Sequence, residues 1–324
     1  MAKKELNRVA IVGAGYMGGG IAQVFALAGH TVTLADRDWE TARAAVARLT
    51  SEVERFESLG LMRAGSTETT AKNLGAAESI EHAVDGAEYV TEAVPEQPEL
   101  KIETLRRISS VLAADAIIGT NTSAIPIADL ADGVAAKDRF LGVHWMNPAP
   151  FIPGVELIAG PETSDSTMVT AEVLIRSLGK ITARVADTPG FVANRLQFAL
   201  YKEATMIVEE GTASPEQIDA VVSNAFGFRL ALFGPFAIGD MAGLDVYHSS
   251  YVSLSKAFGD RFAPPRRLTE LVESGNLGIK AGSGFLDIPP SEMADLLAYR
   301  DEAYSRLLAL RAELGSAPGL SNNG

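Results

Sequence analysis

A histidine and a glutamate stand twelve residues apart near the middle of the chain, where apolar segments end or begin. His144 ends the apolar segment 140–144, and Glu156 lies in the next one, 155–159. Two adjacent strands joined by the proline-rich stretch between these segments would bring both side chains together. A carboxylate bonded to one imidazole nitrogen fixes the tautomer and raises the basicity of the other nitrogen. The pattern therefore predicts a general base that removes an alcohol proton, with a purely structural pair as the competing interpretation.

Other polar side chains stand at strand ends or turns, in the segments 121–123, 144–148 and 190–195. In an open α/β sheet, ligands bind beyond the carboxyl ends of the strands, so residues at these ends can converge. Ser123 and Asn194 are therefore predicted to donate hydrogen bonds to a developing oxyanion or to a nicotinamide ring.

A glycine-rich turn near the N-terminus has the sequence GAGYMG. Gly13 allows a tight turn, Gly15 lets the backbone approach a pyrophosphate, and Gly18 lets the following helix pack closely. Tyr16 and Met17 belong to the same loop, and the helix that follows offers free amide groups and a positive dipole to phosphates. The turn therefore predicts a dinucleotide-binding site.

An acidic residue follows at the distance expected for dinucleotide binding. Asp36 ends the second apolar segment, 23 residues after Gly13. A carboxylate at this place accepts hydrogen bonds from the ribose hydroxyls of adenosine and repels a 2′-phosphate, so NAD is favoured over NADP. Arg37 and Arg43 lie nearby, and an arginine there is able to hold that phosphate, so NADP is the alternative cofactor.

These residues must be positioned by alternating strands and helices in the first half of the chain. Apolar runs predict strands over residues 8–12, 31–35, 89–94, 116–119, 140–144 and 155–159. Helical spacing predicts helices over residues 18–28, 39–59, 100–112 and 167–178. Strand–helix alternation implies a mostly parallel sheet with helices on both faces.

The pattern changes after residues 183–186, and the remaining sequence is nearly all helical. We expect a domain boundary near Asp187, with an α/β domain over residues 1–187 and an all-α domain over residues 188–324. A long amphipathic helix is predicted over residues 191–210, because a glycine and a capping motif follow it.

Several helix ends in the second domain have recognisable sequences. Ser214 is predicted to cap a helix in a capping box, with Pro215 at the first helical position and Gln217 at the third. Asp240 and Asp245 flank a turn and are also expected to cap helices.

The composition excludes several classes of function. The chain of 324 residues has 28 Lys and Arg against 41 Asp and Glu, a net charge of −13. Nucleic acids and anionic membranes both need a basic surface, so neither is an expected partner. The chain has no cysteine, and His30, His82 and His248 lack metal-ligand spacing, so neither a disulfide nor a metal site is expected. No apolar run approaches the roughly 18 residues of a membrane span and no secretory signal is recognised, so we expect a cytoplasmic location.

Several longer motifs follow one another from about residue 8 to residue 287. They are GAGYMGGGIA, VPEQPELK, NTSAIPI, HWMNPAP, VELI, TPGFVANRL, GPFAIGDMAGLD and GIKAGSGF. This ordered set resembles the L-3-hydroxyacyl-CoA dehydrogenase family. The resemblance implies a Rossmann-type, doubly wound NAD-binding domain, a helical C-terminal domain that forms a homodimer, and a small-molecule substrate. It also implies NAD-dependent oxidation of an L-3-hydroxy group to a 3-keto group, with His144 and Glu156 as the catalytic pair.

The resemblance assigns roles to further residues. The substrate-contacting positions of the family match Ser123, Asn147 and Asn194. The implied cofactor-contacting residues are those of the glycine-rich loop together with Asp36, Arg37, Glu96, Lys101, Asn121, Ser123 and Lys280.

Two stretches differ from the acyl-CoA members and indicate an alternative substrate. The helical hairpin 51–72, where those members carry lysines for the CoA phosphates, has only Arg55, Arg63 and Lys72 as cations, and glutamates outnumber them. Arg229 in FGFRLALFGP stands where acyl-CoA members have no arginine, and a guanidinium fits a carboxylate through two hydrogen bonds. These features resemble the branch that acts on small free acids, namely L-gulonate 3-dehydrogenase (lambda-crystallin), L-carnitine dehydrogenase and a pyridine-carboxylate dehydrogenase. Arg229 would then hold the substrate carboxylate, with a structural salt bridge as the competing interpretation.

A protein that binds NAD without catalysis, in a structural or redox-sensing role, is a remote alternative. The predicted His–Glu pair and the oxygen-binding residues argue against it, because cofactor binding alone does not need them.

Overall fold

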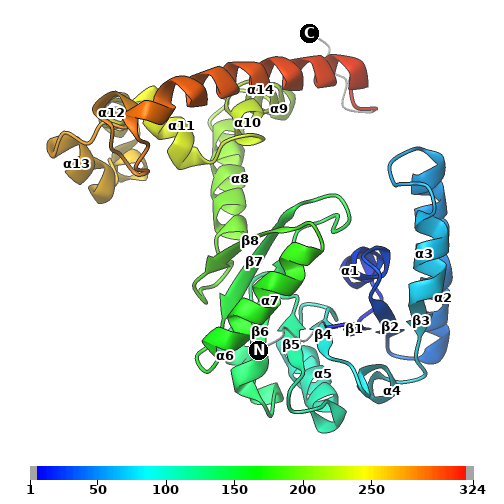
Figure 1. Cartoon of the computed structure of the whole chain (residues 1–324). Coiled ribbons are helices and arrows are strands. Elements are labelled where there is room, and N and C mark those ends of the chain that lie inside the picture. Colours follow the sequence, from blue (N-terminus) through cyan, green and yellow to red (C-terminus); the bar gives the residue numbers. More distant parts are fainter. Residues whose placement is uncertain (1–5, 319–324) are drawn as a thin grey trace. The chain divides into compact units, whose positions relative to one another are not determined.

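The computed structural model describes residues 6–318, which form an α/β unit followed by a helical unit (Figure 1). By residue contacts, the two compact units divide after Leu200. The predicted fold class is confirmed, because a doubly wound, mostly parallel sheet precedes an all-α region. Within residues 6–318, no helix is both long enough and apolar enough to cross a membrane.

One eight-stranded sheet forms the centre of the α/β unit. Its strands are β1 (Arg8–Val12), β2 (Thr31–Ala35), β3 (Leu74–Ala76), β4 (Tyr89–Glu92), β5 (Ile117–Thr120), β6 (Phe140–Trp145), β7 (Gly154–Ala159) and β8 (Ile181–Val185). They lie in the order β3-β2-β1-β4-β5-β6-β7-β8, and every neighbouring pair is parallel except β6 and β7. The chain changes direction across the sheet between β1 and β4, where sheets of this kind bind ligands beyond the carboxyl ends of their strands.

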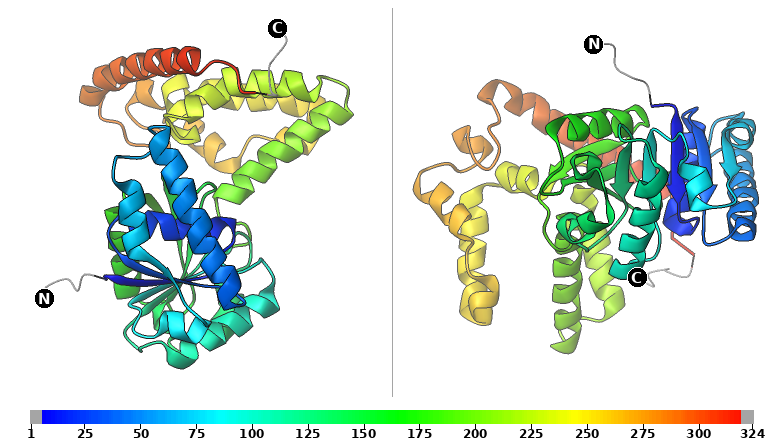
Figure 2. Two further views of the ribbon diagram at one scale, coloured as in Figure 1. Left: turned by 90° about the vertical axis from the view of Figure 1, so that its right-hand side faces the viewer. Right: turned by 90° about the horizontal axis from the view of Figure 1, so that it is seen from below.

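Helices cover both faces of this sheet, as Figure 2 shows from two further directions. Alternate residues of β1 separate the two apolar layers, with Val9 and Ile11 in one and Ala10 and Val12 in the other. The first layer is completed by α1 (Tyr16–Leu27), α2 (Trp39–Ser58) and α7 (Asp165–Ser177), and the second by α4 (Ile80–Val84), α5 (Pro98–Val111) and α6 (Ile127–Leu130). Strands covered on both faces have continuous apolar sequences, which is why the apolar runs predicted them.

The predicted strands and helices of this unit are all present, within two residues at each end. The sequence analysis missed β3, α4 and α6 because elements of three to five residues are too short to show a period. The expected helical hairpin over 51–72 consists of the end of α2 and most of α3 (Ser66–Asn73).

The helical unit continues from α8 (Ala193–Glu209), which begins in the α/β unit and extends past the division. Its further helices are α9 (Pro215–Asn224), α10 (Phe226–Leu230), α11 (Pro235–Ala242), α12 (Leu244–Phe258), α13 (Arg266–Glu273) and α14 (Met293–Leu314). The predicted capping box at Ser214 is confirmed, because Ser214 and Gln217 bond to each other's backbone amides.

The expectation that Asp240 and Asp245 cap helices is wrong. Asp240 lies inside α11, is fully buried, and accepts hydrogen bonds from the amides of Phe285 at 3.1 Å and Leu286 at 2.7 Å. Asp245 lies in the first turn of α12, beyond its cap, and pairs with Lys280. Both carboxylates therefore join α11 and α12 to the segment around residues 280–286 instead of capping a helix.

Candidate active site

The glycine-rich turn connects β1 to α1 and has the geometry of a phosphate-binding loop. Gly13 has a left-handed φ of 107°, and a Cβ on it would lie 2.5 Å from the carbonyl oxygen of Ala93. A Cβ on Gly18 would lie 1.8 Å from the carbonyl oxygen of Gly13, so only glycine allows the helix to pack this closely. A Cβ on Gly15 would meet nothing within 4 Å. The turn is therefore open at Gly15, the side from which a pyrophosphate would approach.

The first turn of α1 is suited to bind an anion. Its cap residue Gly15 provides no side chain, its first turn contains no acidic residue, and Tyr16 is exposed. Met17 is partly buried and packs against the apolar core. The amide groups at the helix start and the helix dipole both favour negative charge there. These residues fit the pyrophosphate of NAD.

Asp36 follows β2 and lies beside the glycine-rich turn. Its carboxylate accepts hydrogen bonds from the amides of Ala14 at 2.6 Å and Arg37 at 2.7 Å. The Arg37 guanidinium donates to Asp38 at 3.0 Å and Thr41 at 3.3 Å. Because this guanidinium already has a carboxylate partner, the arrangement fits the ribose of NAD better than a 2′-phosphate.

His144 and Glu156 are direct partners in the antiparallel pair of β6 and β7. This register turns both side chains to the same face of the sheet. His144 Nδ1 lies 2.8 Å from Glu156 Oε2, and the two residues are only 4% and 6% exposed. An ionised carboxylate can only accept, so Nδ1 carries the proton and Nε2 is left as an acceptor.

The other oxygen of Glu156 is bound by the start of α8. Oε1 accepts hydrogen bonds from the amides of Val192 at 3.0 Å and Ala193 at 2.9 Å. Burial raises the pKa of Glu156, but hydrogen bonds from His144 and the two amides outweigh burial and bring the pKa below its usual 4.5. The carboxylate is therefore ionised at neutral pH, with both oxygens occupied.

The turn that supplies these amides has an unusual backbone. Gly190 and Phe191 both have left-handed φ angles, of 74° and 46°. Phe191 is fully buried, and its ring centroid lies 5.7 Å from that of His144. A bulky residue adopts such a φ only where packing compensates for the strain. The buried ring therefore holds the start of α8 against Glu156, and the helix that the sequence predicted from residue 191 begins at Ala193.

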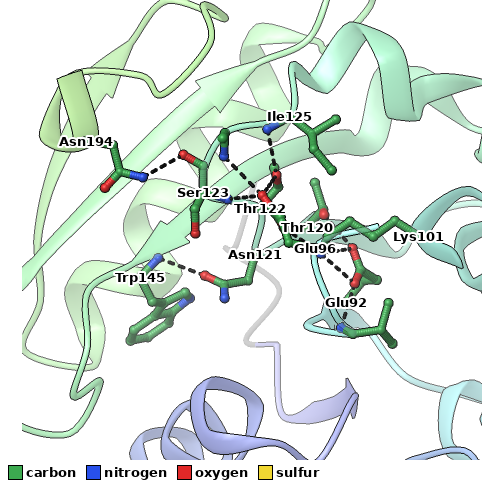
Figure 3. Close-up of polar contacts among 12 residues, drawn as sticks. Glu92, Glu96, Lys101, Thr120, Asn121, Thr122, Ser123, Ile125, Trp145 and Asn194 are labelled. Carbon is green, nitrogen blue, oxygen red and sulfur yellow. Dashed lines mark hydrogen bonds and ion pairs between the residues drawn. The ribbon is translucent and has the colours of Figure 1, made fainter. Parts of the chain in front are cut away.

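A second set of polar contacts joins the ends of β4 and β5 (Figure 3). Glu96 Oε1 accepts hydrogen bonds from Thr122 Oγ1 at 2.6 Å, from Ser123 N at 2.7 Å and from Ala124 N at 3.1 Å. Burial raises the pKa of Glu96, but these bonds and the Lys101 ammonium lower the pKa by more, to below its usual value. An ionised Glu96 therefore holds the turn that carries Ser123.

Asn194 connects the two sets of contacts. Its Nδ2 donates to the carbonyl oxygen of Ser123 at 3.0 Å, as Figure 3 shows. It directly follows Ala193, whose amide binds Glu156. The structure thus brings Ser123, Asn194 and the His–Glu pair together through successive contacts within the α/β unit.

Asn121 and Asn147 lie on either side of the end of β6. Asn121 is buried, and its Oδ1 accepts a hydrogen bond from the amide of Trp145 at 3.0 Å. Asn147 lies in the loop after β6 and is exposed, and its side chain makes no hydrogen bond within the described part of the chain. Asn121 therefore has a structural contact next to His144, whereas the amide of Asn147 is available to a ligand.

Lys101, a predicted cofactor contact, has a completely buried side chain. Its Nζ lies 3.0 Å from Glu92 Oε1 and 3.5 Å from Glu96 Oε2. Sequence analysis missed Glu92, although a charged residue inside the apolar run 89–94 was a readable signal. Lys101 therefore contacts two carboxylates beneath the sheet edge.

A second lysine near the site was also missed. Lys180 Nζ donates to the carbonyl oxygens of Ala149 at 2.5 Å and Ile152 at 2.8 Å, and burial lowers its pKa. Lys180 thereby fixes the loop between β6 and β7. No sequence pattern could indicate this role, because both partners are backbone carbonyl groups.

The other two predicted residues lie in the helical unit. Arg229 belongs to α10 and is partly buried, and within residues 6–318 its guanidinium makes neither an ion pair nor a hydrogen bond. The structural salt bridge considered for Arg229 is therefore absent from that part of the chain. Lys280 pairs with Asp245. The described residues also contain no group of three or more His, Cys, Asp or Glu side chains that could hold a metal ion.

Comparison with known proteins identifies two family models along the chain. The 3-hydroxyacyl-CoA dehydrogenase NAD binding domain matches residues 8–188, and the 3-hydroxyacyl-CoA dehydrogenase C-terminal domain matches residues 190–288. The 5-formyl-3-hydroxy-2-methylpyridine 4-carboxylate 5-dehydrogenase of Mesorhizobium japonicum is 36% identical over 94% of this chain and 97% of its own length. A probable 3-hydroxybutyryl-CoA dehydrogenase of Bacillus subtilis is 34% identical over 87% of this chain and 98% of its own length. The crystal structure of a 3-hydroxyacyl-CoA dehydrogenase from Archaeoglobus fulgidus has a TM-score of 0.78 and 31% identity, covering 94% of this chain and 99% of that one.

Replacing Glu156 with glutamine should make the stability difference from the wild type depend on pH. At neutral pH we expect a loss of about 1–3 kcal/mol in unfolding free energy, because an ionised hydrogen-bond acceptor is removed. The lowered pKa of Glu156 means that its contribution is present above 4.5 and is lost as pH falls through the folded-state pKa, so the difference should narrow there. Urea unfolding at a series of pH values measures this. Glu162→Gln, at an exposed surface pair, is the control, and a Glu156→Gln difference that stays constant with pH would contradict the assignment.

Proposed function

Because the chain belongs to the 3-hydroxyacyl-CoA dehydrogenase family, we propose that it is an NAD-dependent dehydrogenase that oxidises a 3-hydroxy group to a 3-keto group, with His144 as the base that removes the hydroxyl proton. The buried contact of 2.8 Å between His144 and Glu156 is the observation that carries this proposal. The same contact argues against a purely structural NAD-binding protein, since cofactor binding alone does not need a base.

His144 and Glu156 have different roles in the proposed proton transfer. Nδ1–H of His144 donates to Glu156, so Nε2 accepts the proton of the substrate hydroxyl. Glu156 holds the ring in this orientation and balances the charge of the imidazolium that forms. NAD, when bound, supplies the acceptor for the hydride that leaves the substrate carbon. The buried ring of Phe191 beside His144 excludes water from that side of the base.

Three polar residues are proposed to bind the reacting oxygen and its neighbours. The Ser123 hydroxyl stands on the turn fixed by Glu96, and Asn194 is fixed to the same turn through the carbonyl oxygen of Ser123. Asn147 has an exposed amide with no partner among the described residues. Donors placed in advance where negative charge develops stabilise that charge without reorganising.

Replacing His144 with glutamine should lower kcat by about 10²–10⁴, because proton removal loses its base. NADH binding should stay within about twofold, since the substitution keeps the size and polarity of the side chain. Steady-state assays of NADH formation measure kcat, and calorimetric titration measures the binding of NADH. His82→Gln, at an exposed histidine, is the control. Turnover retained in His144→Gln would rule out His144 as the base.

We propose a small hydroxy acid with a free carboxylate as the substrate. Arg229 has no ionic partner within residues 6–318, which suits a guanidinium reserved for a ligand. The hairpin of α2 and α3 supports the same choice, because residues 51–72 contain only Arg55, Arg63 and Lys72 as cations, and Arg55 lies over the ring of Phe56. The phosphates of CoA would normally meet more cations than these. The M. japonicum relative, named for a pyridine carboxylate, is consistent with this choice.

A 3-hydroxyacyl-CoA thioester is the second candidate, favoured by the names of the relatives from B. subtilis and A. fulgidus. The two candidates are separated by assaying 3-hydroxybutyryl-CoA and acetoacetyl-CoA beside L-gulonate, L-carnitine, 3-hydroxybutyrate and hydroxymethyl-pyridine carboxylates. With a free acid, Arg229→Ala should raise KM by about 10–100-fold through loss of a charged hydrogen bond. Arg229→Lys should recover part of this loss, since a lysine keeps the charge without the fork. Turnover of the thioesters alone, or an unchanged KM in Arg229→Ala, would contradict the free-acid proposal.

We also propose that the helical domain, over about residues 188–324, forms a homodimer. Apolar side chains are exposed along its helices, including Tyr201 at 71% on α8, Val221 at 61% on α9 and Leu308 at 64% on α14. Exposed apolar surface of this kind commonly marks a protein interface. Sedimentation velocity should give twice the mass of one chain, and Tyr201→Glu should shift the protein to monomer. A wild-type monomer at micromolar concentration would exclude the homodimer.

A further inference from the structure

A fully buried ion pair lies beneath the carboxyl edge of the sheet, outside the His–Glu pair. Glu92 ends β4 and Lys101 lies on α5, and both side chains have no exposed surface. Lys101 Nζ contacts the two oxygens of Glu92 at 3.0 and 3.2 Å. The remaining acceptor positions of Glu92 are filled by Val94 N at 2.8 Å and Thr120 Oγ1 at 2.5 Å. The two charged groups therefore have partners within the protein, both each other and neighbouring polar groups.

A buried ion pair of this kind is not expected to stabilise the fold more than apolar side chains would. Removing two charges from water costs free energy that their attraction often fails to recover, and a well-packed apolar pair of the same volume is frequently at least as stable. Glu92 lies beside β5 and Lys101 lies on α5, and apolar side chains of these two elements, such as Ile118 and Leu105, are buried in the core. A specific geometric role for the charges is therefore indicated.

The pair connects directly to the turn that carries Ser123. Lys101 Nζ also lies 3.5 Å from Glu96 Oε2, and Glu96 Oε1 binds the amides of Ser123 and Ala124 (Figure 3). Ser123 in turn binds Asn194 through its carbonyl oxygen. One buried cation thus aligns two carboxylates, of which one lies in the interior and the other holds the turn.

The position of this turn along the sheet indicates which half of the cofactor it serves. Asp36 follows β2, and the glycine-rich turn follows β1, so the adenosine ribose and the pyrophosphate of NAD occupy that side. Glu96 follows β4, and Ser123 follows β5, on the other side of β1. The turn therefore lies toward the nicotinamide half of the dinucleotide.

We infer that Glu92 is a positioning residue that sets the nicotinamide half of the NAD site by holding Lys101 and, through Lys101, Glu96. This inference rests on the NAD-dependent function proposed above but not on the identity of the substrate. The expectation from family resemblance that Lys101 contacts the cofactor stays a separate prediction. The inference also gives a role to Thr120, whose hydroxyl fixes the second oxygen of Glu92.

The test compares two ligands that share one half. NADH contains both halves of the dinucleotide, whereas ADP lacks the nicotinamide ring and the ribose attached to it. Glu92→Gln and Lys101→Met should each weaken NADH binding by about tenfold, as expected when a charged hydrogen bond is lost, and should leave ADP binding within about twofold. Thr120→Val is a milder variant that keeps every charge, and it should move the same ratio in the same direction by a smaller factor. Isothermal titration of the full chain measures all four proteins.

A matched control exists on the same helix. Arg107 of α5 binds Glu81 at 2.7 and 2.9 Å, and Glu81→Gln removes an ion pair of similar geometry away from the cofactor edge. Glu81→Gln should leave the ratio of the NADH and ADP dissociation constants unchanged. Equal weakening of both ligands in the Glu92 and Lys101 variants, or no change in NADH, would overturn the inference.

The outcomes also separate this inference from the proposed function. Binding of NADH requires no turnover, so the altered ratio supports the positioning role even if no hydroxy acid is oxidised. Conversely, an unchanged ratio in Thr120→Val and in both charge variants would remove the positioning role while leaving His144 as the base.

Discussion

A carboxylate buried away from water is tolerated only when both of its oxygens are bound. Glu156 meets this requirement through two separate parts of the chain, because β6 supplies His144 and the start of α8 supplies the amides of Val192 and Ala193. The need to satisfy one buried charge therefore constrains the register of β6 against β7. It also constrains the left-handed turn at Phe191 and the residue at which α8 begins.

Other carboxylates along the carboxyl edge of the sheet also accept hydrogen bonds from backbone amides. Asp36 binds the amide of Ala14, and Glu96 binds the amides of Ser123 and Ala124. Asp187 binds the amides of Ile127 and Ala128 at 2.7 and 2.9 Å, where α6 begins. Irregular loops at this edge have amides that no strand or helix satisfies, and carboxylates supply the missing acceptors. The loops are thereby fixed in advance of any ligand.

The sequence predicted what depends on local patterns. Buried strands have continuous apolar sequences, the glycine-rich turn has a characteristic spacing, and a short proline-rich loop restricts how far His144 can lie from Glu156. Contacts between distant segments left no such pattern. Lys180 binds a carbonyl group 31 residues away, and Asp240 binds an amide 45 residues away, so local capping rules gave the wrong role for Asp240. The left-handed φ of Phe191 was equally hidden, because packing and not residue type imposes it.

The two buried pairs at this edge, Glu92–Lys101 and Glu156–His144, differ in how the charge of the carboxylate is balanced. In the Glu92–Lys101 pair the two charges balance each other, and neither side chain has exposed surface. Glu156 faces His144, and the proposed mechanism places a positive charge on that ring only during proton transfer. Hydrogen bonds keep Glu156 ionised beforehand and hold its pKa below the usual value. In the proposed mechanism, the charge that proton transfer creates on His144 therefore meets a carboxylate that is already ionised and fixed, and no side chain has to move to receive it.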